Sequence, residues 1–229
     1  MCTACVGLFE DYNLGLPFPK INPEPVDKVV LIWGGASSVG SCGIQAAKAA
    51  GLEVASTASA HNAEYCKSIG ADYVFDYKKE GVVEEIVGAL KGKAFAGVFA
   101  AVMGEDVYIK SAEIAIQLGG KQMVATVLPE NMAYDKPLPG GVQIGYSEFS
   151  DLVLGDTLLT SRKDWGDSLK NTPLGPAIWE RWMPAALANG TLQCKPDAYV
   201  VGQGLEKIQE ACDLMRAGAS ARKYVVELP

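Results

Sequence analysis

The sequence predicts an α/β fold built on a doubly wound parallel sheet, with helices on both faces. Two observations lead to this prediction. Between residues 26 and 126, apolar segments rich in β-branched residues alternate with segments in which apolar residues recur at helical spacing. The first apolar segment also runs through the turn LIWGGASSVG (31–40) directly into a helical segment. Strands that alternate with helices in this way are typical of a parallel sheet covered on both faces.

Each element of the first half follows from its own residues. Short segments dense in Val, Ile, Phe and Tyr predict strands, and longer segments with apolar residues three or four positions apart predict helices. Glycines at the ends of the helical segments are typical stop signals. The expected strands are 26–33, 53–59, 71–77, 94–102 and 121–126, and the expected helices are 41–51, 62–71, 81–92 and 106–118.

The second half of the chain is less regular. It combines turn-forming residues, a long polar stretch and two amphipathic segments, the first of which has proline in its first turn. We expect turns over 129–141, a sixth strand over 142–149, a surface excursion over 155–175, helices over 176–190 and 205–218, and a terminal strand over 221–229.

Composition narrows the class of protein. The 229 residues carry a net charge of −7, which repels nucleic-acid phosphates and anionic lipid, so neither nucleic acid nor a membrane is expected as a partner. No apolar stretch reaches the length that crosses a bilayer, and the N-terminus resembles neither a secretory signal nor a transit peptide, which predicts a cytoplasmic location. Cys2 and Cys5 form a C-x-x-C pair, but His61 is the single histidine and no second pair follows, so no metal site is expected.

The turn at 31–40 is a candidate phosphate-binding site. At a strand-to-helix turn, free backbone N–H groups and the positive end of the helix dipole point to one place, and small residues let a phosphate come close. Gly34, Ser37 and Gly40 fall at the three glycine positions of the dinucleotide fingerprint, with serine in the middle. Ser38 and Val39 complete the predicted cradle. The alternative is a glycine-rich turn that binds nothing.

The end of the second strand bears on which cofactor would bind. An Asp or Glu there accepts hydrogen bonds from a ribose 2′-hydroxyl and repels a 2′-phosphate. This chain has Ser59, His61 and Asn62 instead, and Tyr77 ends the third strand where it can close over the adenosine. Neutral donors without a carboxylate favour NADP(H) over NAD(H).

These predicted elements divide the chain into a lead-in (1–25), a dinucleotide-binding core (26–150) and a C-terminal region (151–229).

Longer stretches of the sequence resemble a known family. VLIWGGASSVGSCGIQAAKAAG, TASAHNAEYCKSIGADYVFDYKKEGVVEEI and GLEKIQEACDLMRAGASARKYVVEL are similar to the cofactor domain, of Rossmann type, and the C-terminal end of medium-chain dehydrogenases/reductases. The GGASSVG turn, the His-Asn pair and the central insertion resemble fungal zinc-independent trans-acting enoyl reductases, which work beside polyketide synthases. Those proteins begin with a GroES-like β-rich domain that has no counterpart here. Residues 1–25 resemble the helix that follows that domain, with Ala4 and Cys5 near the place of a family threonine pair.

The resemblance implies a reaction. NADPH delivers hydride to the β-carbon of an α,β-unsaturated thioester, negative charge moves to the carbonyl oxygen, and a proton is added at Cα. It also implies that Val102 and Met103 after the fourth strand, and Ala125 and Thr126 after the fifth, flank the ribose and nicotinamide. The implied partners are a polyketide-type small molecule and a polyketide synthase. No acid–base residue is assigned, because His61 lies at the adenine end, so the catalytic residues stay unknown.

Two further functions stay open. The chain could instead be a repurposed non-redox enzyme, a cyclase or pericyclase, that holds its substrate in a half-cleft lined by Tyr146, Trp165, Trp179 and Trp182. Tryptophans placed like the last two, on the apolar face of a helix, are more often part of a core than a platform for a ligand. The third possibility is a non-catalytic binding subunit. The terminal strand must pair with another strand, extend the main sheet or stay exposed. An exposed strand edge favours a homodimer, unless the excursion over 155–175 covers it.

Overall fold

The computed structural model describes residues 1–129, 132, 134–147 and 173–228. Within them, one six-stranded sheet forms the centre of the molecule, with every neighbouring pair parallel and the strand order β3-β2-β1-β4-β5-β6. This is the order of a doubly wound fold, and it confirms the predicted fold class. The strands are β1 (Lys28–Trp33), β2 (Glu53–Ala58), β3 (Tyr73–Asp76), β4 (Ala94–Ala100), β5 (Met123–Thr126) and β6 (Gln143–Gly145).

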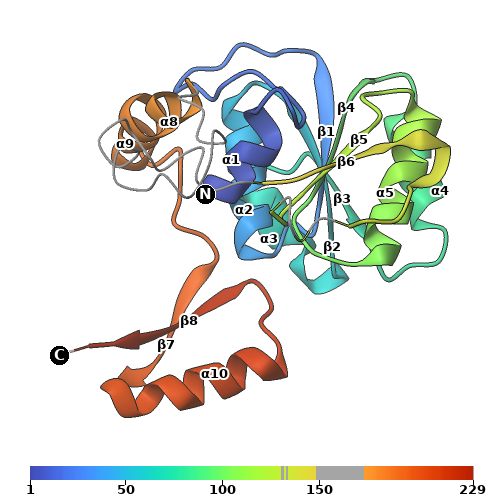
Figure 1. The fold of residues 1–229 in the computed structure, drawn as a ribbon. Coiled ribbons are helices and arrows are strands. Elements are labelled where there is room, and N and C mark those ends of the chain that lie inside the picture. Colours follow the sequence, from blue (N-terminus) through green and yellow to red (C-terminus); the bar gives the residue numbers. More distant parts are fainter. Residues whose placement is uncertain (130–131, 133, 148–172, 229) are drawn as a thin grey trace, which may run out of the picture.

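Helices cover both faces of this sheet (Figure 1). The first face packs against α1 (Cys2–Phe9), α2 (Ser38–Ala49) and α3 (Ala63–Ser68), and the second against α4 (Val82–Leu90) and α5 (Glu105–Leu118). β1 contributes side chains to the cores on both faces of the sheet because successive side chains of a strand point to opposite faces. Val30 and Ile32 belong to the core on the α1–α3 side, whereas Leu31 and Trp33 belong to the core on the α4–α5 side.

The strand order reverses beside β1, which pairs with β2 on one side and β4 on the other. Trp33, the last residue of β1, lies opposite Thr57 of β2 and Ala100 of β4. Chain segments leaving these strands therefore diverge to opposite faces of the sheet just beyond Trp33. In open α/β sheets, ligands bind at this point, outside the carboxyl ends of the strands.

Some boundaries differ from those predicted, for physical reasons. Helix α2 begins at Ser38, three residues earlier than expected, because the Ser37 side chain caps it by accepting a hydrogen bond from the Gly40 N–H at 3.0 Å. The helix expected at 62–71 is the short η1 (Ala60–Asn62) followed by α3. The expected sixth strand is limited to the three residues of β6 among the described positions, and residues 148–172, which hold most of the expected excursion, lie outside them.

A helical segment after the undescribed stretch packs on the α1–α3 layer. It comprises α8 (Leu174–Pro176), the π-helix η5 (Ala177–Trp182) and α9 (Met183–Ala188). Ile178 and Trp182 are buried in the same core as α1 and α2. The predicted helix over 176–190 is thus present, with a wider π-type turn in its middle.

The C-terminal residues form a second, smaller unit that the sequence did not fully predict. It consists of β7 (Asp197–Gln203), the short η6 (Leu205–Lys207), α10 (Ile208–Ala217) and β8 (Arg222–Glu227). β7 and β8 pair in parallel as a two-stranded sheet, with Tyr199 opposite Tyr224. The terminal strand therefore found a partner, β7, that was missing from the predicted elements. We call residues 197–227 the C-terminal unit and the rest of the described chain the body.

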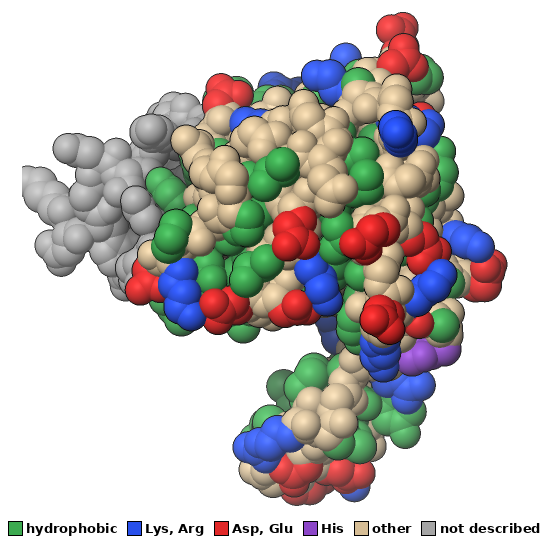
Figure 2. All heavy atoms as spheres, turned by 90° about the vertical axis from the view of Figure 1, so that its right-hand side faces the viewer, with side chains coloured by type: hydrophobic (Ala, Val, Ile, Leu, Met, Phe, Trp, Pro, Cys, Tyr) green, Lys and Arg blue, Asp and Glu red, His purple; other side chains and the backbone are tan. Residues whose placement is uncertain are grey.

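The C-terminal unit projects from the body as a separate lobe (Figures 1 and 2). Its strands and helix contain no buried residue, and large apolar side chains such as those of Tyr199, Leu205 and Met215 are 48%, 67% and 51% exposed. No helix among the described residues is long and apolar enough to cross a membrane.

Candidate functional site

A cavity of about 660 Å³ opens where the chain diverges beyond β1. Its floor is formed by the last residues of β1 and β2 and the residues that follow them. One wall comes from the segment after β4, another from the end of β3, and a third from the turn between α10 and β8. The lining residues are Trp33, Gly34, Ala36, Ser37, Thr57, Ala58, Ser59, His61, Asn62, Tyr77, Lys78, Val102, Met103, Val107 and Ala217–Ala221.

The turn between β1 and α2 is wound too tightly to tolerate side chains at its glycines. A Cβ on Gly40 would lie 2.2 Å from the Gly34 carbonyl oxygen, and a Cβ on Gly35 would lie 2.1 Å from Ser56 Oγ. Gly34 has a φ of +88°, and a Cβ there would lie 2.8 Å from a methyl carbon of Val102. The turn therefore keeps the start of α2 close to β1, and the only side chains that it adds to the cavity lining are the small ones of Ala36 and Ser37.

Hydrogen bonds fix the shape of this turn. The Gly34 N–H donates to Thr57 Oγ1 at 3.0 Å, which ties the turn to β2. On its other side, Ser41 Oγ lies 2.8 Å from the Tyr65 hydroxyl and 2.8 Å from the Ser37 carbonyl oxygen. Burial raises the pKa of the Tyr65 hydroxyl above its usual value. The turn is thus held from α2, β2 and α3 together.

The N-terminus of α2 offers backbone donors toward an anion. Ser37 caps the helix, so the Gly40 N–H is already bonded to Ser37 Oγ. The N–H groups of Ser38 and Val39 lie in the first helical turn, where the helix itself has no carbonyl for them. Together with the positive end of the helix dipole, they favour a negatively charged group at this end of the cavity.

The opposite end of the cavity is polar and holds the residues predicted to contact adenosine. Ser59 Oγ donates to the Tyr77 hydroxyl at 3.2 Å, which joins the ends of β2 and β3. Asn62 Nδ2 donates to Ser220 Oγ at 2.9 Å, and His61 Nε2 lies 2.8 Å from the same oxygen. The Lys78 ammonium lies 5.8 Å from the centre of the Tyr77 ring, so a cation stands at this end as well.

The structure brings most of the predicted cofactor residues to one cavity. Those in its lining are Gly34, Ser37, Ser59, His61, Asn62, Tyr77, Val102 and Met103. Ser38, Val39 and Gly40 lie in the adjoining first turn of α2. Ala125 and Thr126 do not line it: both are buried, and the Thr126 hydroxyl donates to the Gly145 carbonyl oxygen at 2.8 Å. Their predicted contact with the nicotinamide stays a prediction.

Three of the residues predicted for a substrate half-cleft, Tyr146, Trp179 and Trp182, are not part of this cavity lining. Tyr146 stacks on Tyr12 with ring centroids 5.3 Å apart. Trp182 is 4% exposed within the main core, and Trp179 packs partly buried against that core, as the alternative interpretation of the two tryptophans expected. Trp165 falls outside the described residues.

Sequence reasoning missed several lining residues. Trp33, Ala36, Thr57 and Ala58 flank predicted positions, and their place at or just after the carboxyl ends of strands was the available signal, whereas Val107 lies in the first turn of α5. Lys78 follows Tyr77 directly, so its place after the third predicted strand was a signal for it. The turn Ala217–Ala221 had no such signal, because only the fold brings it beside η1.

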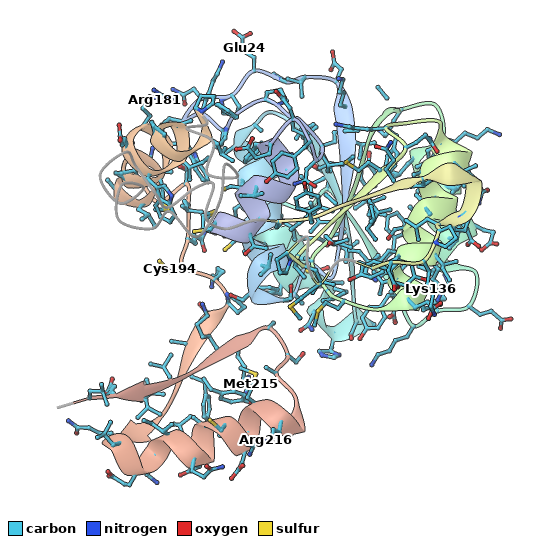
Figure 3. All side chains as sticks on the ribbon, viewed as in Figure 1. Glu24, Lys136, Arg181, Cys194, Met215 and Arg216 are labelled. Carbon is cyan, nitrogen blue, oxygen red and sulfur yellow. The ribbon has the colours of Figure 1, made fainter. Side chains whose placement is uncertain are left out.

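The thiols differ sharply in burial. Burial raises the pKa of the Cys5 thiol far above its ordinary value and that of Cys66 to about 11. Cys194 and Cys212 are exposed; Cys194 lies in the segment that leads into β7 (Figure 3). Among the described residues, no group of three or more His, Cys, Asp or Glu side chains is placed to hold a metal ion.

Comparison with known proteins gives consistent relatives. Residues 38–139 match the family model described as zinc-binding dehydrogenase. The chain is 35% identical over 216 residues to the trans-enoyl reductase himH of Aspergillus japonicus, covering 94% of this chain and 57% of that protein. It is 35% identical over 237 residues to the dehydrogenase pigH of Monascus ruber, covering 100% of this chain and 63% of that protein. The chain thus spans about three fifths of the length of these relatives.

Solved structures share the fold. The Escherichia coli quinone oxidoreductase, solved with NADPH, superposes with a TM-score of 0.67 at 19% identity, over 99% of this chain and 62% of the other. The CurF ER cyclopropanase from the curacin A biosynthetic pathway also gives a TM-score of 0.67, at 18% identity, over 99% of this chain and 59% of the other. At this level of identity the likeness concerns the fold alone.

The cavity fits a dinucleotide by its own geometry. The glycine turn presents backbone to one end, the start of α2 supplies N–H donors for phosphate, and small residues such as Ala36 and Ala58 leave room between them. The polar end offers neutral side chains and Lys78. The residues present therefore suit a ligand with a pyrophosphate in its middle and a polar group at one end.

Proposed function

The chain belongs to the medium-chain dehydrogenase/reductase superfamily, and from this premise we propose that it binds NADPH in the cavity beyond β1 and forms the cofactor part of an enoyl-reductase-like oxidoreductase. One observation carries the proposal. The cavity of about 660 Å³ lies at the carboxyl ends of β1, β2 and β4 and is bounded by a turn of small residues and the N-terminus of α2. Dinucleotides bind at this place in doubly wound sheets.

In this proposal the chain's residues bind and orient the cofactor. The N–H groups of Ser38 and Val39 hold the pyrophosphate, and Gly40 keeps α2 close enough to β1 for them to reach it. Val102 and Met103 give an apolar wall against the sugar and ring portions. The cofactor itself supplies hydride transfer when bound. No acid–base residue is assigned, and the catalytic residues stay unknown.

We further propose that NADPH is preferred to NADH. Ser59, His61, Asn62 and Lys78 lie around the polar end of the cavity, where a carboxylate would repel a 2′-phosphate. Lys78 adds a positive charge to the neutral donors that the sequence predicted at this end of the cavity. The expected discrimination is electrostatic, so it should weaken as salt is raised.

The proposed substrate is an α,β-unsaturated thioester of polyketide type, with a polyketide synthase as the proposed partner. This rests on the relatives at 35% identity, of which himH is named a trans-enoyl reductase. The alternatives of a cyclase, a pericyclase or a binding subunit have no specific observation in their favour among the described residues. The reductase-like function is therefore the one proposed.

We also propose that the protein is a homodimer. Leu205, Ile208 and Met215 of the C-terminal unit expose large apolar side chains, as do Tyr199 and Val200 on its sheet. A second copy that covered them would remove apolar surface from water. Light scattering coupled to size exclusion tests this, because a single species of 24.2 kDa across micromolar concentrations would contradict a dimer.

Calorimetric titration with NADPH tests the cofactor proposal. Ala36 lines the cavity at the turn, so Ala36→Glu places a carboxylate beside the proposed pyrophosphate. The matched control, Ala36→Gln, has the same shape without the charge. We expect Ala36→Glu to weaken NADPH binding at least ten-fold more than Ala36→Gln does. Equal affinities of the two variants would contradict a phosphate at this turn, and a wild-type protein that bound no NADPH would overturn the proposal.

A second experiment tests the redox step. Oxidation of NADPH is followed by absorbance in the presence of a simple enoyl thioester, with the saturated thioester as the control. Turnover with the unsaturated compound alone supports a reductase. Cofactor binding without turnover would limit the chain to cofactor binding.

A further inference from the structure

The C-terminal unit meets the body at the cavity. The turn Ala217–Ala221, between α10 and β8, supplies one wall of it. Within that turn, Ser220 Oγ accepts a hydrogen bond from Asn62 Nδ2 at 2.9 Å and lies 2.8 Å from His61 Nε2. A residue of the unit is thus bonded to two body residues that belong to the proposed cofactor site, across 158 and 159 positions of sequence.

The backbone around Ser220 is held in an uncommon conformation. Ala221 has a φ of +46°, in the left-handed region that alanine rarely adopts, and Gly218 has a φ of +111°. The Ala221 conformation is costly for a residue with a Cβ, and such conformations concentrate at ligand clamps and switch regions. Here the bend turns the Ser220 hydroxyl away from the unit and toward η1 of the body. The turn thus carries a contact with the body in addition to the hydrogen bond that its Gly218 carbonyl oxygen accepts from the Tyr224 hydroxyl at 3.4 Å within the unit.

The chemistry of the three side chains suits an anion. A hydroxyl accepts from one neighbour while it donates to another group. Asn62 Nδ2 gives one hydrogen to Ser220 and keeps a second. With Ser220 as a shared partner, His61 and Asn62 are both held at the polar end of the cavity. When the His61 Nε2–H donates to Ser220, the second Asn62 N–H and the Ser220 hydroxyl proton are left for an acceptor.

We propose that Ser220 is a positioning residue for the 2′-phosphate of NADPH and that, through it, cofactor binding is coupled to docking of the C-terminal unit on the body. This rests on the proposed NADPH site. Ser220 acts by orienting His61 and Asn62 and by offering its own hydroxyl to the phosphate. NADH lacks this phosphate, so Ser220 matters for NADPH and much less for NADH.

The test compares Ser220→Ala with wild-type full-length chain by titration with NADPH and with NADH. We expect NADPH affinity to fall about ten-fold, the effect of losing a hydrogen bond to a charged group. NADH affinity should stay within about two-fold. Ser220→Thr keeps the hydroxyl and should restore most of the NADPH affinity. The control Ser68→Ala removes an exposed hydroxyl that donates to the Tyr65 carbonyl oxygen at 2.8 Å, outside the cavity lining, and should change neither affinity.

Hydrogen exchange gives a second readout that affinity alone does not provide. In wild type, NADPH should slow amide exchange in residues 205–227, and in Ser220→Ala this slowing should be lost at a cofactor concentration that saturates the variant. Equal loss of affinity for NADPH and NADH would overturn the inference, since it would indicate a general structural role. Unchanged NADPH affinity in Ser220→Ala would overturn the inference and leave the proposed function standing. A wild type that binds no NADPH would overturn both.

Discussion

The body and the C-terminal unit are made from the same kinds of element, yet they differ in how those elements are stabilised. In the body, β1, β2, β4 and β5 are buried along almost their whole length between two layers of helices. In the unit, a parallel pair of strands and one helix leave every residue at least partly exposed. A two-stranded sheet is marginal in water without further layers. The difference shows that the buried core comes from helices packed on the faces of the sheet, and that hydrogen bonding between strands alone does not provide it.

The body and the C-terminal unit also contribute different parts of the proposed cofactor site. The body supplies the turn, the helix N-terminus and the ends of the strands, all held by buried residues. The unit supplies one wall through a turn that rests on two hydrogen bonds to Ser220. Changes in the body are therefore expected to cost stability and binding together, while changes in the unit should affect binding with little cost in stability.

The largest effect is expected from the core of the body. Phe99 is fully buried between β4 and the helices α1 and α2, where its ring packs on Gly43. Phe99→Ala should lower the free energy of unfolding by about 3 to 5 kcal/mol. Leu205→Ala, which removes a side chain that is 67% exposed, should cost less than about 1 kcal/mol. Urea denaturation of both variants checks this, and similar losses would break the contrast.

A pair of glycines gives an intermediate effect. Gly40→Ala would place a Cβ 2.2 Å from the Gly34 carbonyl oxygen, which is backbone and cannot move aside easily. We expect a cost of about 1 to 3 kcal/mol together with loss of NADPH binding. At Gly218 the added Cβ meets nothing within 4 Å, and only the φ of +111° opposes it. Gly218→Ala should cost about 1 kcal/mol, and thermal melting with calorimetry compares the two.

The smallest effect on stability is expected from alkylation of the exposed thiols. The reactivity of the thiols distinguishes exposed positions from the buried core of the body. At pH 8, Cys194 and Cys212 should be alkylated by iodoacetamide, while Cys5 and Cys66 should resist because a raised pKa keeps them as thiols and burial blocks access. The reactivity of Cys66 should grow as pH rises toward about 11, if the fold survives. Mass spectrometry identifies the modified residues. Alkylation of Cys66 at pH 8 as fast as that of Cys212 would contradict the assigned burial.

The same contrast explains how much the sequence predicted. In the body, buried parallel strands have continuous apolar runs and helices have periodic ones, so five of the strands and the phosphate turn could be located from local pattern. β7 was missed because its seven residues are mostly exposed and Gly202 interrupts the pattern of Tyr199 and Val200. Ser220 was missed for a different reason. Its partners His61 and Asn62 are far away in sequence, and local pattern carries no information about such contacts.

The pairing of β7 with β8 has a consequence for the order of folding. These strands belong to one contiguous stretch, 197–227, so bringing them together closes a short loop. By contrast, one edge of β1 forms its hydrogen bonds only when it pairs with β4, at 94–100. Short loops close at lower entropic cost and reopen as readily, so the unit should form and lose its structure on its own timescale. During synthesis, the body's strands also leave the ribosome first. Pulse-labelled refolding should then show one phase in β4, whose pairing with β1 closes the longer loop, and a separate, faster phase in β7 and β8, and a single common phase would contradict this independence.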